Sequence, residues 1–182
     1  KLARAQAPNP IRKLFNRSFF SPQFDYKERV GGYWDRVGKL QFDFLLSEGL
    51  RPEHYLLDVA CGSFRAGRFF IEYLLPSHYY GFDGDCELIK QGIKHVLKPA
   101  GLLAKKPVIH CVKLTPEPLD FMKLFKRKFD YIWIHALFDH IPPDVVRATL
   151  IGLSKVLAST GYIYATIFLN PDPSYTGSIL HL

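Results

Sequence analysis

The chain of 182 residues is 48% apolar and carries a net charge of +7. This length fits one domain that buries its own core. No apolar run reaches the roughly 18 to 20 residues that cross a bilayer, and no charged-then-apolar leader opens the sequence. These features predict a soluble, cytoplasmic protein without a transmembrane segment.

The positive charge is concentrated at the amino end. Residues 1–30 contain seven basic and two acidic side chains, a net charge of +5, which leaves +2 for residues 31–182. A nearly neutral body argues against a broad phosphate-binding face. We therefore expect residues 1–30 to form a basic, solvated arm, with nucleic-acid binding through this arm as the less favoured alternative.

The three cysteines, Cys61, Cys86 and Cys111, are odd in number and widely spaced, without a Cys-x-x-Cys pair. This pattern is typical of neither a disulfide framework nor a zinc site. It predicts three reduced cysteines.

An amphipathic helix is predicted first, after an irregular segment with one helical turn near residues 11–15. Apolar residues recur at helical spacing from Tyr33 and stop at Gly49, a residue suited to ending a helix. Strand-like and helix-like segments alternate from there on. The expected strands are 55–60, 79–82, 108–112, 131–134 and 162–168, and the expected helices are 65–75, 86–97, 119–125 and 143–157.

This alternation predicts an α/β fold, a doubly wound, mainly parallel sheet with helices on both faces. Ligands bind such sheets beyond the carboxyl ends of the strands, and the first strand-to-helix turn is the usual nucleotide contact. Here that turn is 61–67, in which Gly62 permits a close approach to a ligand and Gly67 a close helix. The turn lacks Gly-x-Gly-x-x-Gly, which argues against a nicotinamide-dependent oxidoreductase.

The segment Leu57-Asp-Val-Ala-Cys-Gly-Ser, with Gly67 beyond it, resembles motif I of class I, Rossmann-like S-adenosylmethionine-dependent methyltransferases. Ala60 and Phe64 stand where that family usually has its first and third glycines, and Gly62 keeps the middle one. The Phe64 ring is expected either to pack on the body or to narrow the cofactor pocket. The resemblance implies S-adenosylmethionine as cofactor and residues 31–182 as the methyltransferase-like domain.

An acid at the end of the second strand strengthens this interpretation. Asp83, 25 positions after Asp58, is placed to accept hydrogen bonds from both hydroxyls of a ribose, whereas Asp85 suits a helix cap. The cofactor-binding residues that we expect are Asp58, Ala60, Cys61, Gly62, Ser63, Gly67, Asp83, Gly84, His135 and Ala136.

The segment after the fourth strand resembles the family's wall between cofactor and substrate, where His135, Ala136 and Phe138 match the lining positions. His135 and His140 are the candidates for a catalytic base. The alternative is that His140 packs near the turn at residues 142–143. No third or fourth ligand accompanies these histidines and Asp139, so no metal site is predicted.

The expected helix at 33–49 resembles the family's leading helix over the cofactor, and simple packing is the alternative. Its candidate covering residues are Tyr33, Arg36, Gly38 and Gln41. Arg36 or Arg65 would suit the methionine carboxylate. No acid follows the third strand, so Thr115 or backbone groups would have to contact the adenine.

The function implied by the resemblance is methyl transfer from S-adenosylmethionine to an unidentified acceptor, a small molecule being favoured. Such transfer depends mainly on positioning. The alternative is a non-catalytic S-adenosylmethionine-binding or scaffold domain. The family sheet has seven strands, whereas five are expected here with at most a short strand at 179–182, so we expect a C-terminally truncated core without the last two strands.

Overall fold

A computed structural model describes residues 25–167. It contains one five-stranded sheet, in which every neighbouring pair is parallel and the order is β3-β2-β1-β4-β5. The strands are β1 (Leu56–Val59), β2 (Tyr79–Asp83), β3 (Val108–Cys111), β4 (Phe129–Ile134) and β5 (Leu157–Ala165). The prediction of a doubly wound parallel sheet is confirmed. The helical turn expected near 11–15 and the short strand expected at 179–182 lie outside the described residues.

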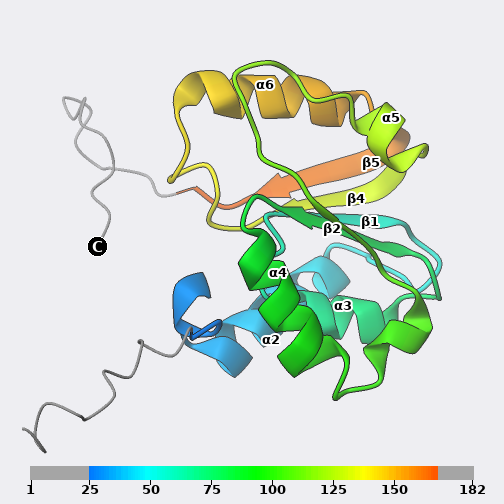
Figure 1. The fold of residues 1–182 in the computed structure, drawn as a ribbon. Helices are drawn as coiled ribbons and strands as arrows, with labels where there is room; N and C mark the ends of the chain where they lie inside the picture. Colours follow the sequence, from blue (N-terminus) through cyan, green and yellow to red (C-terminus); the bar gives the residue numbers. More distant parts are fainter. Residues whose placement is uncertain (1–24, 168–182) are drawn as a thin grey trace, which may run out of the picture.

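Helices cover both faces of the sheet (Figure 1). On one face lie α2 (Trp34–Ser47), α3 (Gly67–Tyr73) and α4 (Cys86–Gly92), the last continuing as the π-helical turn η2 (Ile93–Leu97). On the other lie α5 (Phe121–Phe125) and α6 (Pro143–Ser154). Two short 3-10 helices, η1 (Glu28–Val30) and η3 (Leu102–Lys105), complete the described elements.

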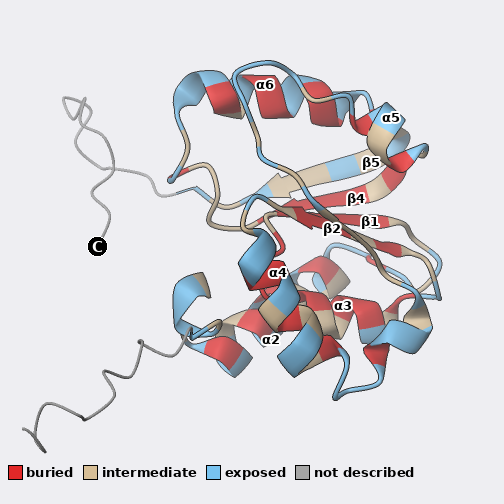
Figure 2. Ribbon diagram, viewed as in Figure 1, coloured by how far each residue is buried: buried red, intermediate tan, exposed pale blue. Residues whose placement is uncertain are grey.

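The core has two parts, one on each side of the sheet. Successive strand residues point to opposite faces, so Leu56 joins the cluster under α2, α3 and α4, and Leu57 joins the cluster under α5 and α6. All four residues of β1 are buried because this strand is central and covered on both faces (Figure 2). Burial on both faces fixes the carboxyl end of β1 firmly in the middle of the sheet.

The helix boundaries follow from local capping. The Asp85 carboxylate accepts hydrogen bonds from the Glu87 and Leu88 amides, which confirms its predicted role as the cap of α4. Pro143 occupies the first turn of α6, where the missing amide hydrogen costs nothing. The end of α6 differs from the prediction, because Leu157 begins β5 and is not part of the helix.

The prediction of three reduced cysteines is wrong. Cys86 and Cys111 form a disulfide with a Cα–Cα distance of 5.3 Å, and the third, Cys61, is free and buried. The register of β2 and β3 places Cys111 opposite Asp83, just before the start of α4. The pairing of β2 with β3 thus brings together two cysteines that are 25 residues apart in the sequence. Local spacing of cysteines does not predict such a contact.

No helix of residues 25–167 is long and apolar enough to cross a membrane. Strand order reverses beside β1, which lies between β2 and β4. In open parallel sheets the crevice beyond such a reversal is the usual ligand site.

Candidate functional site

A cavity of about 410 Å³ opens at this reversal, beyond the carboxyl ends of β1, β2 and β4. Its volume lies within the range of about 300 to 1,000 Å³ that is usual for small-molecule sites. The wall contains acidic, basic and apolar groups. The lining residues are Glu28, Arg29, Val30, Gly31, Gln41, Asp58, Ala60, Cys61, Gly62, Arg65, Ala66, Asp83, Leu88, His135, Ala136 and His140.

In the loop after β1, every second residue from Ala60 to Phe64 has a left-handed backbone conformation. Ala60, Gly62 and Phe64 have φ of 58°, 55° and 68°. A non-glycine residue in this region costs roughly 1 to 2 kcal/mol, so glycine is preferred wherever the chain must adopt it. These are the three positions at which the methyltransferase motif carries glycine, so the loop keeps the backbone shape of the motif despite its two substitutions.

The Phe64 side chain packs on the body and does not narrow the cavity. It is fully buried in the cluster under α3 and α4. A β-carbon at Gly92 would lie 2.7 Å from Phe64 Cδ2, and one at Gly67 would lie 3.2 Å from its ring. The two glycines therefore make room for the ring between the helices, on the side of the loop away from the cavity.

Asp83 ends β2 and binds the loop. Its Oδ2 accepts a hydrogen bond from the Gly62 amide at 2.8 Å, and its Oδ1 accepts one from the Asp85 amide at 2.8 Å. Burial raises the pKa of this carboxyl above its usual value, although the backbone amides favour the ionised form. Each carboxylate oxygen can accept a second hydrogen bond, so Asp83 remains able to bind a ligand hydroxyl.

Asp58 is the other acid of the cavity. It is only 5% exposed, and its Oδ2 accepts a hydrogen bond from the Tyr79 hydroxyl at 2.7 Å. Burial raises the pKa of Asp58 to about 7; the Tyr79 hydrogen bond lowers it, and the nearby charge of Asp83 raises it. The cavity thus holds a carboxyl that titrates near neutral pH.

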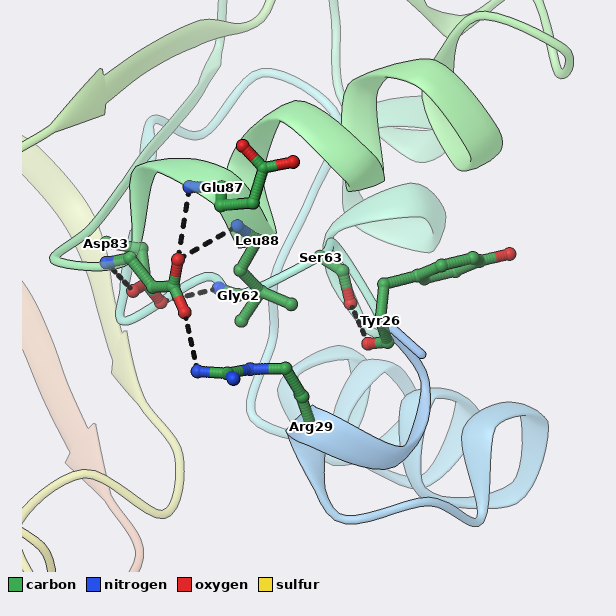
Figure 3. A network of polar contacts seen from close by, with 8 residues as sticks. Tyr26, Arg29, Gly62, Ser63, Asp83, Glu87 and Leu88 are labelled. Carbon is green, nitrogen blue, oxygen red and sulfur yellow. Dashed lines mark hydrogen bonds and ion pairs between the residues drawn. The ribbon is translucent and has the colours of Figure 1, made fainter. Parts of the chain in front are cut away.

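Residues 25–31, which we call the strap, lie against the loop after β1 (Figure 3). The Ser63 hydroxyl donates to the Tyr26 carbonyl at 2.7 Å, and Arg29 forms an ion pair with Asp85 at 2.9 Å. A β-carbon at Gly62 would lie 2.8 Å from Val30 Cγ1. The strap therefore contacts both the loop and the start of α4, and it supplies one wall of the cavity.

Helix α2 packs against the loop after β1 and contributes one residue, Gln41, to the cavity wall. A β-carbon at Gly38 would lie 2.4 Å from the Arg65 carbonyl oxygen, so this glycine permits close contact between helix and loop. Gln41 lines the cavity, and its Oε1 accepts a hydrogen bond from Trp133 Nε1 at 2.9 Å. Of the other candidates, Tyr33 directly precedes this helix and is 77% exposed, and neither Tyr33 nor Arg36 lines the cavity.

The wall beyond β4 is made by His135, Ala136 and His140. The Ala136 amide donates to Thr166 Oγ1 at 2.8 Å, and the same hydroxyl lies 3.3 Å from His135 Nδ1. Burial and the nearby charge of Arg65 lower the pKa of His135 to about 4. His135 is therefore uncharged at neutral pH, which leaves one ring nitrogen able to accept a proton.

Solved structures share this arrangement of strands and helices. No protein-family model matches the sequence. The glycopeptide N-methyltransferase MtfA, solved with sinefungin, is 11% identical with a TM-score of 0.57, over 70% of this chain and 52% of MtfA. PH0226 from Pyrococcus horikoshii is 18% identical with a TM-score of 0.59, over 77% of this chain and 60% of its own.

Magnesium protoporphyrin IX methyltransferase (ChlM) from Synechocystis, solved with bound S-adenosylmethionine, is 18% identical with a TM-score of 0.54, over 84% of this chain and 74% of its own. The chain has the class I methyltransferase fold. At these identities the likeness establishes the fold alone. The chain spans little more than half the length of MtfA and of PH0226.

The class I fold brings most of the expected site residues to the cavity. Those in its wall are Asp58, Ala60, Cys61, Gly62, Asp83, His135, Ala136 and His140. Ser63, Gly67 and Gly84 are not lining residues: the first bonds the strap, the second packs against Tyr79, and the third lies beside Lys113.

Of the other candidates, Arg65 lines the cavity and donates to the Gly32 carbonyl at 3.1 Å. Burial lowers the pKa of this guanidinium from its usual value. Thr115 donates to the Glu117 carbonyl and does not line the cavity. His140 lies in the cavity wall, which favours the site interpretation over packing at the turn.

The lining residues missed from the sequence are Ala66, Leu88 and the strap residues Glu28, Arg29, Val30 and Gly31. The strap begins within the segment that we expected to be a solvated arm, and its charge pattern gives no sign of the contact. Leu88 had a weak signal in the sequence. It lies three residues after Asp85, the predicted helix cap, which in turn follows the candidate ligand residue Asp83. No group of three or more His, Cys, Asp or Glu residues in 25–167 is arranged to hold a metal ion.

Proposed function

We propose that the cavity binds S-adenosylmethionine and that the protein transfers its methyl group to a small-molecule acceptor. The observation that carries this proposal is the Asp83 carboxylate at the end of β2. It is held by the Gly62 amide while its oxygens keep acceptor sites for the two ribose hydroxyls. The class I fold, whose members MtfA and ChlM were solved with such ligands, supports it.

The residues of the cavity fit an adenosyl ligand. Leu88 offers an apolar surface beside Gly62, where the absence of a β-carbon lets the backbone approach the ligand. Asp58 supplies a negative charge for the ammonium group, and Arg65 a cation for the carboxylate of the methionine moiety. None of the described residues between β3 and β4 lines the cavity, so this segment supplies no contact that we assign to the adenine base.

When bound, S-adenosylmethionine supplies an electrophilic methyl group on a sulfonium sulfur. The residues of the chain then hold the acceptor in line with this group and exclude water from it. Where the acceptor is a hydroxyl, His135 or His140 takes its proton. His135 is the better candidate because it is half-buried in the cavity wall, whereas His140 is exposed. Its lowered pKa keeps it uncharged and able to accept a proton at neutral pH, at the cost of a lower basicity.

The second candidate is an S-adenosylmethionine-binding domain without methyl transfer. It is favoured by the lack of a cavity-lining residue among the described residues between β3 and β4, because no side chain of this segment is then available to select the ligand. The two candidates differ in one result. Turnover of S-adenosylmethionine to its demethylated product with any acceptor supports the enzyme, and tight binding without turnover supports the binding domain.

Calorimetric titration of the full chain with S-adenosylmethionine, and with its demethylated product, tests the proposal. We expect Asp83→Ala to weaken binding about a hundredfold, since two hydrogen bonds to a charged group contribute roughly 3 kcal/mol. Asp130→Ala is the matched control, because Asp130 accepts from the Tyr55 amide away from the cavity. Absence of binding by a wild-type protein that circular dichroism shows to be folded would contradict the proposal.

A further inference from the structure

A phenol on the neighbouring strand contacts the buried acid of the cavity. The Tyr79 hydroxyl on β2 donates to Asp58 Oδ2 on β1 at 2.7 Å. Asp58 lines the cavity and Tyr79 does not. Among residues 25–167, Tyr79 is the one hydrogen-bond donor that reaches this carboxyl. The phenol therefore acts on a ligand through the lining residues that it contacts, which are Asp58 and, next to it, the neutral thiol of Cys61.

Two glycines make space for the Tyr79 hydroxyl. A β-carbon at Gly67 would lie 2.6 Å from the phenolic oxygen, and one at Gly81 would lie 3.1 Å from it. Gly81 is also the register partner of Asp58 in the β1–β2 pair. The loop and the strand thus leave an opening through which the hydroxyl reaches the carboxyl: a β-carbon at Gly67 would displace the hydroxyl, and one at Gly81 would crowd it.

Burial acts on both members of this pair. It raises the pKa of Asp58 to about 7, and the Tyr79 hydrogen bond is the largest opposing effect. It also raises the pKa of Tyr79 well above its usual value, so the phenol keeps its proton and remains a donor at neutral pH. Near pH 7 the ionisation of Asp58 is therefore sensitive to the loss of one hydrogen bond.

The other charged groups around Asp58 come from four parts of the chain. The acidic neighbours are Asp83 at the end of β2 and Glu28 of the strap, and the thiol of Cys61 in the loop has a pKa raised by burial and stays neutral. The basic neighbours are Arg29 of the strap, Arg65 of the loop, and His135 and His140 beyond β4. Arg29 pairs with Asp85, and His135 is uncharged at neutral pH.

We propose that Tyr79 is a positioning residue of the cavity, whose hydroxyl holds the Asp58 carboxylate oriented and ionised for a cationic ligand. The identity of that ligand, S-adenosylmethionine, rests on the proposed function. The hydrogen bond between Tyr79 and Asp58 belongs to the ligand-free chain and can be tested without it. Ligand affinity then rises with pH as Asp58 ionises. The Tyr79 hydrogen bond lowers the pH at which half of this rise has occurred.

The direct test follows the carboxyl carbon of Asp58 by NMR in ligand-free protein labelled at aspartate, with Asp58→Asn to assign the signal. We expect Tyr79→Phe to raise the titration midpoint of Asp58 by about one to two pH units, the size of a hydrogen bond to a charged group. Tyr131→Phe is the matched control, because its hydroxyl donates to the Glu48 carbonyl away from the cavity. An unchanged midpoint in Tyr79→Phe would overturn the proposal.

The ligand test measures S-adenosylmethionine affinity between pH 6 and pH 9. We expect Tyr79→Phe to lose about tenfold in affinity at pH 7 and to recover most of it at pH 9, where Asp58 ionises without help. Asp58→Asn should show no such pH dependence. An equal loss at every pH would mean that the phenol acts on the fold alone and would overturn the proposal. Absence of wild-type binding at every pH would refute the proposed function, while the NMR titration would still decide the role of Tyr79.

Discussion

The two sides of the cavity are built in different ways. The carboxylate side, formed by β1, β2 and the loop between β1 and α3, holds Asp58 and Asp83, and its backbone and side chains are tied to one another by hydrogen bonds. The histidine side beyond β4 presents His135, half-buried, and His140, exposed. An acidic side whose carboxylates are held by hydrogen bonds suits an unchanging cationic ligand, whereas a side with an exposed imidazole suits a variable acceptor.

The largest expected effect comes from replacing Phe64, because its fully buried ring packs behind the loop that forms the carboxylate side. Phe64→Ala should lower the free energy of unfolding by about 3 to 5 kcal/mol, as is usual for a fully buried phenylalanine. Chemical denaturation measures this loss. Phe138→Ala is the comparison: Phe138 lies between the two histidines in the chain and is half-buried against the core under α5 and α6, so its replacement should cost clearly less. Equal losses would mean that packing does not distinguish the two segments.

Ala60 gives a smaller effect of opposite sign. Its φ of 58° suits glycine, so Ala60→Gly should raise the free energy of unfolding by about 0.5 to 1 kcal/mol. Ala66→Gly is the matched control, since Ala66 has a φ of −90° and should lose stability. If Ala60→Gly destabilises the protein in thermal melts, the left-handed backbone at Ala60 does not strain the loop.

The smallest expected effect on binding comes from the histidine side. His135→Gln should change S-adenosylmethionine affinity by less than about twofold, because the proposed cofactor contacts lie on the carboxylate side. With a hydroxyl acceptor, the same substitution should reduce kcat by roughly a hundredfold or more, and His140→Gln should act less. A large loss of cofactor affinity in His135→Gln would instead assign this residue to the donor.

The sequence predicted the elements of the sheet and the carboxylate side well, because both have local signals. The strand pattern placed Asp58 and Asp83 at neighbouring strand ends, and the glycines marked the loop between them. Contacts between distant segments had no such signal. The Cys86–Cys111 disulfide and the hydrogen bond from Ser63 to Tyr26 join residues 25 and 37 positions apart, and neither follows from periodicity.

The start of strand β5 was also not predicted from the sequence. It begins at Leu157, five positions before the expected start, and its pairing with β4 changes register between Phe129 and Tyr131. Helical spacing continues across residue 154, so the sequence alone extends the preceding helix too far. The direction of the Phe64 ring was likewise undecided, because the ring fits against Gly92 of α4, a contact with a distant segment that the sequence does not reveal.

The strap has a consequence for how a ligand enters and leaves. Its ion pair, Arg29 with Asp85, has side chains that are 56% and 31% exposed, and such pairs contribute roughly 0 to 1 kcal/mol. The strap is also held by the Ser63 hydrogen bond to the Tyr26 carbonyl and by the packing of Val30 against Gly62. Its detachment would break these local contacts and leave the sheet and both core clusters intact, so we expect a ligand to enter and leave by local opening of the strap.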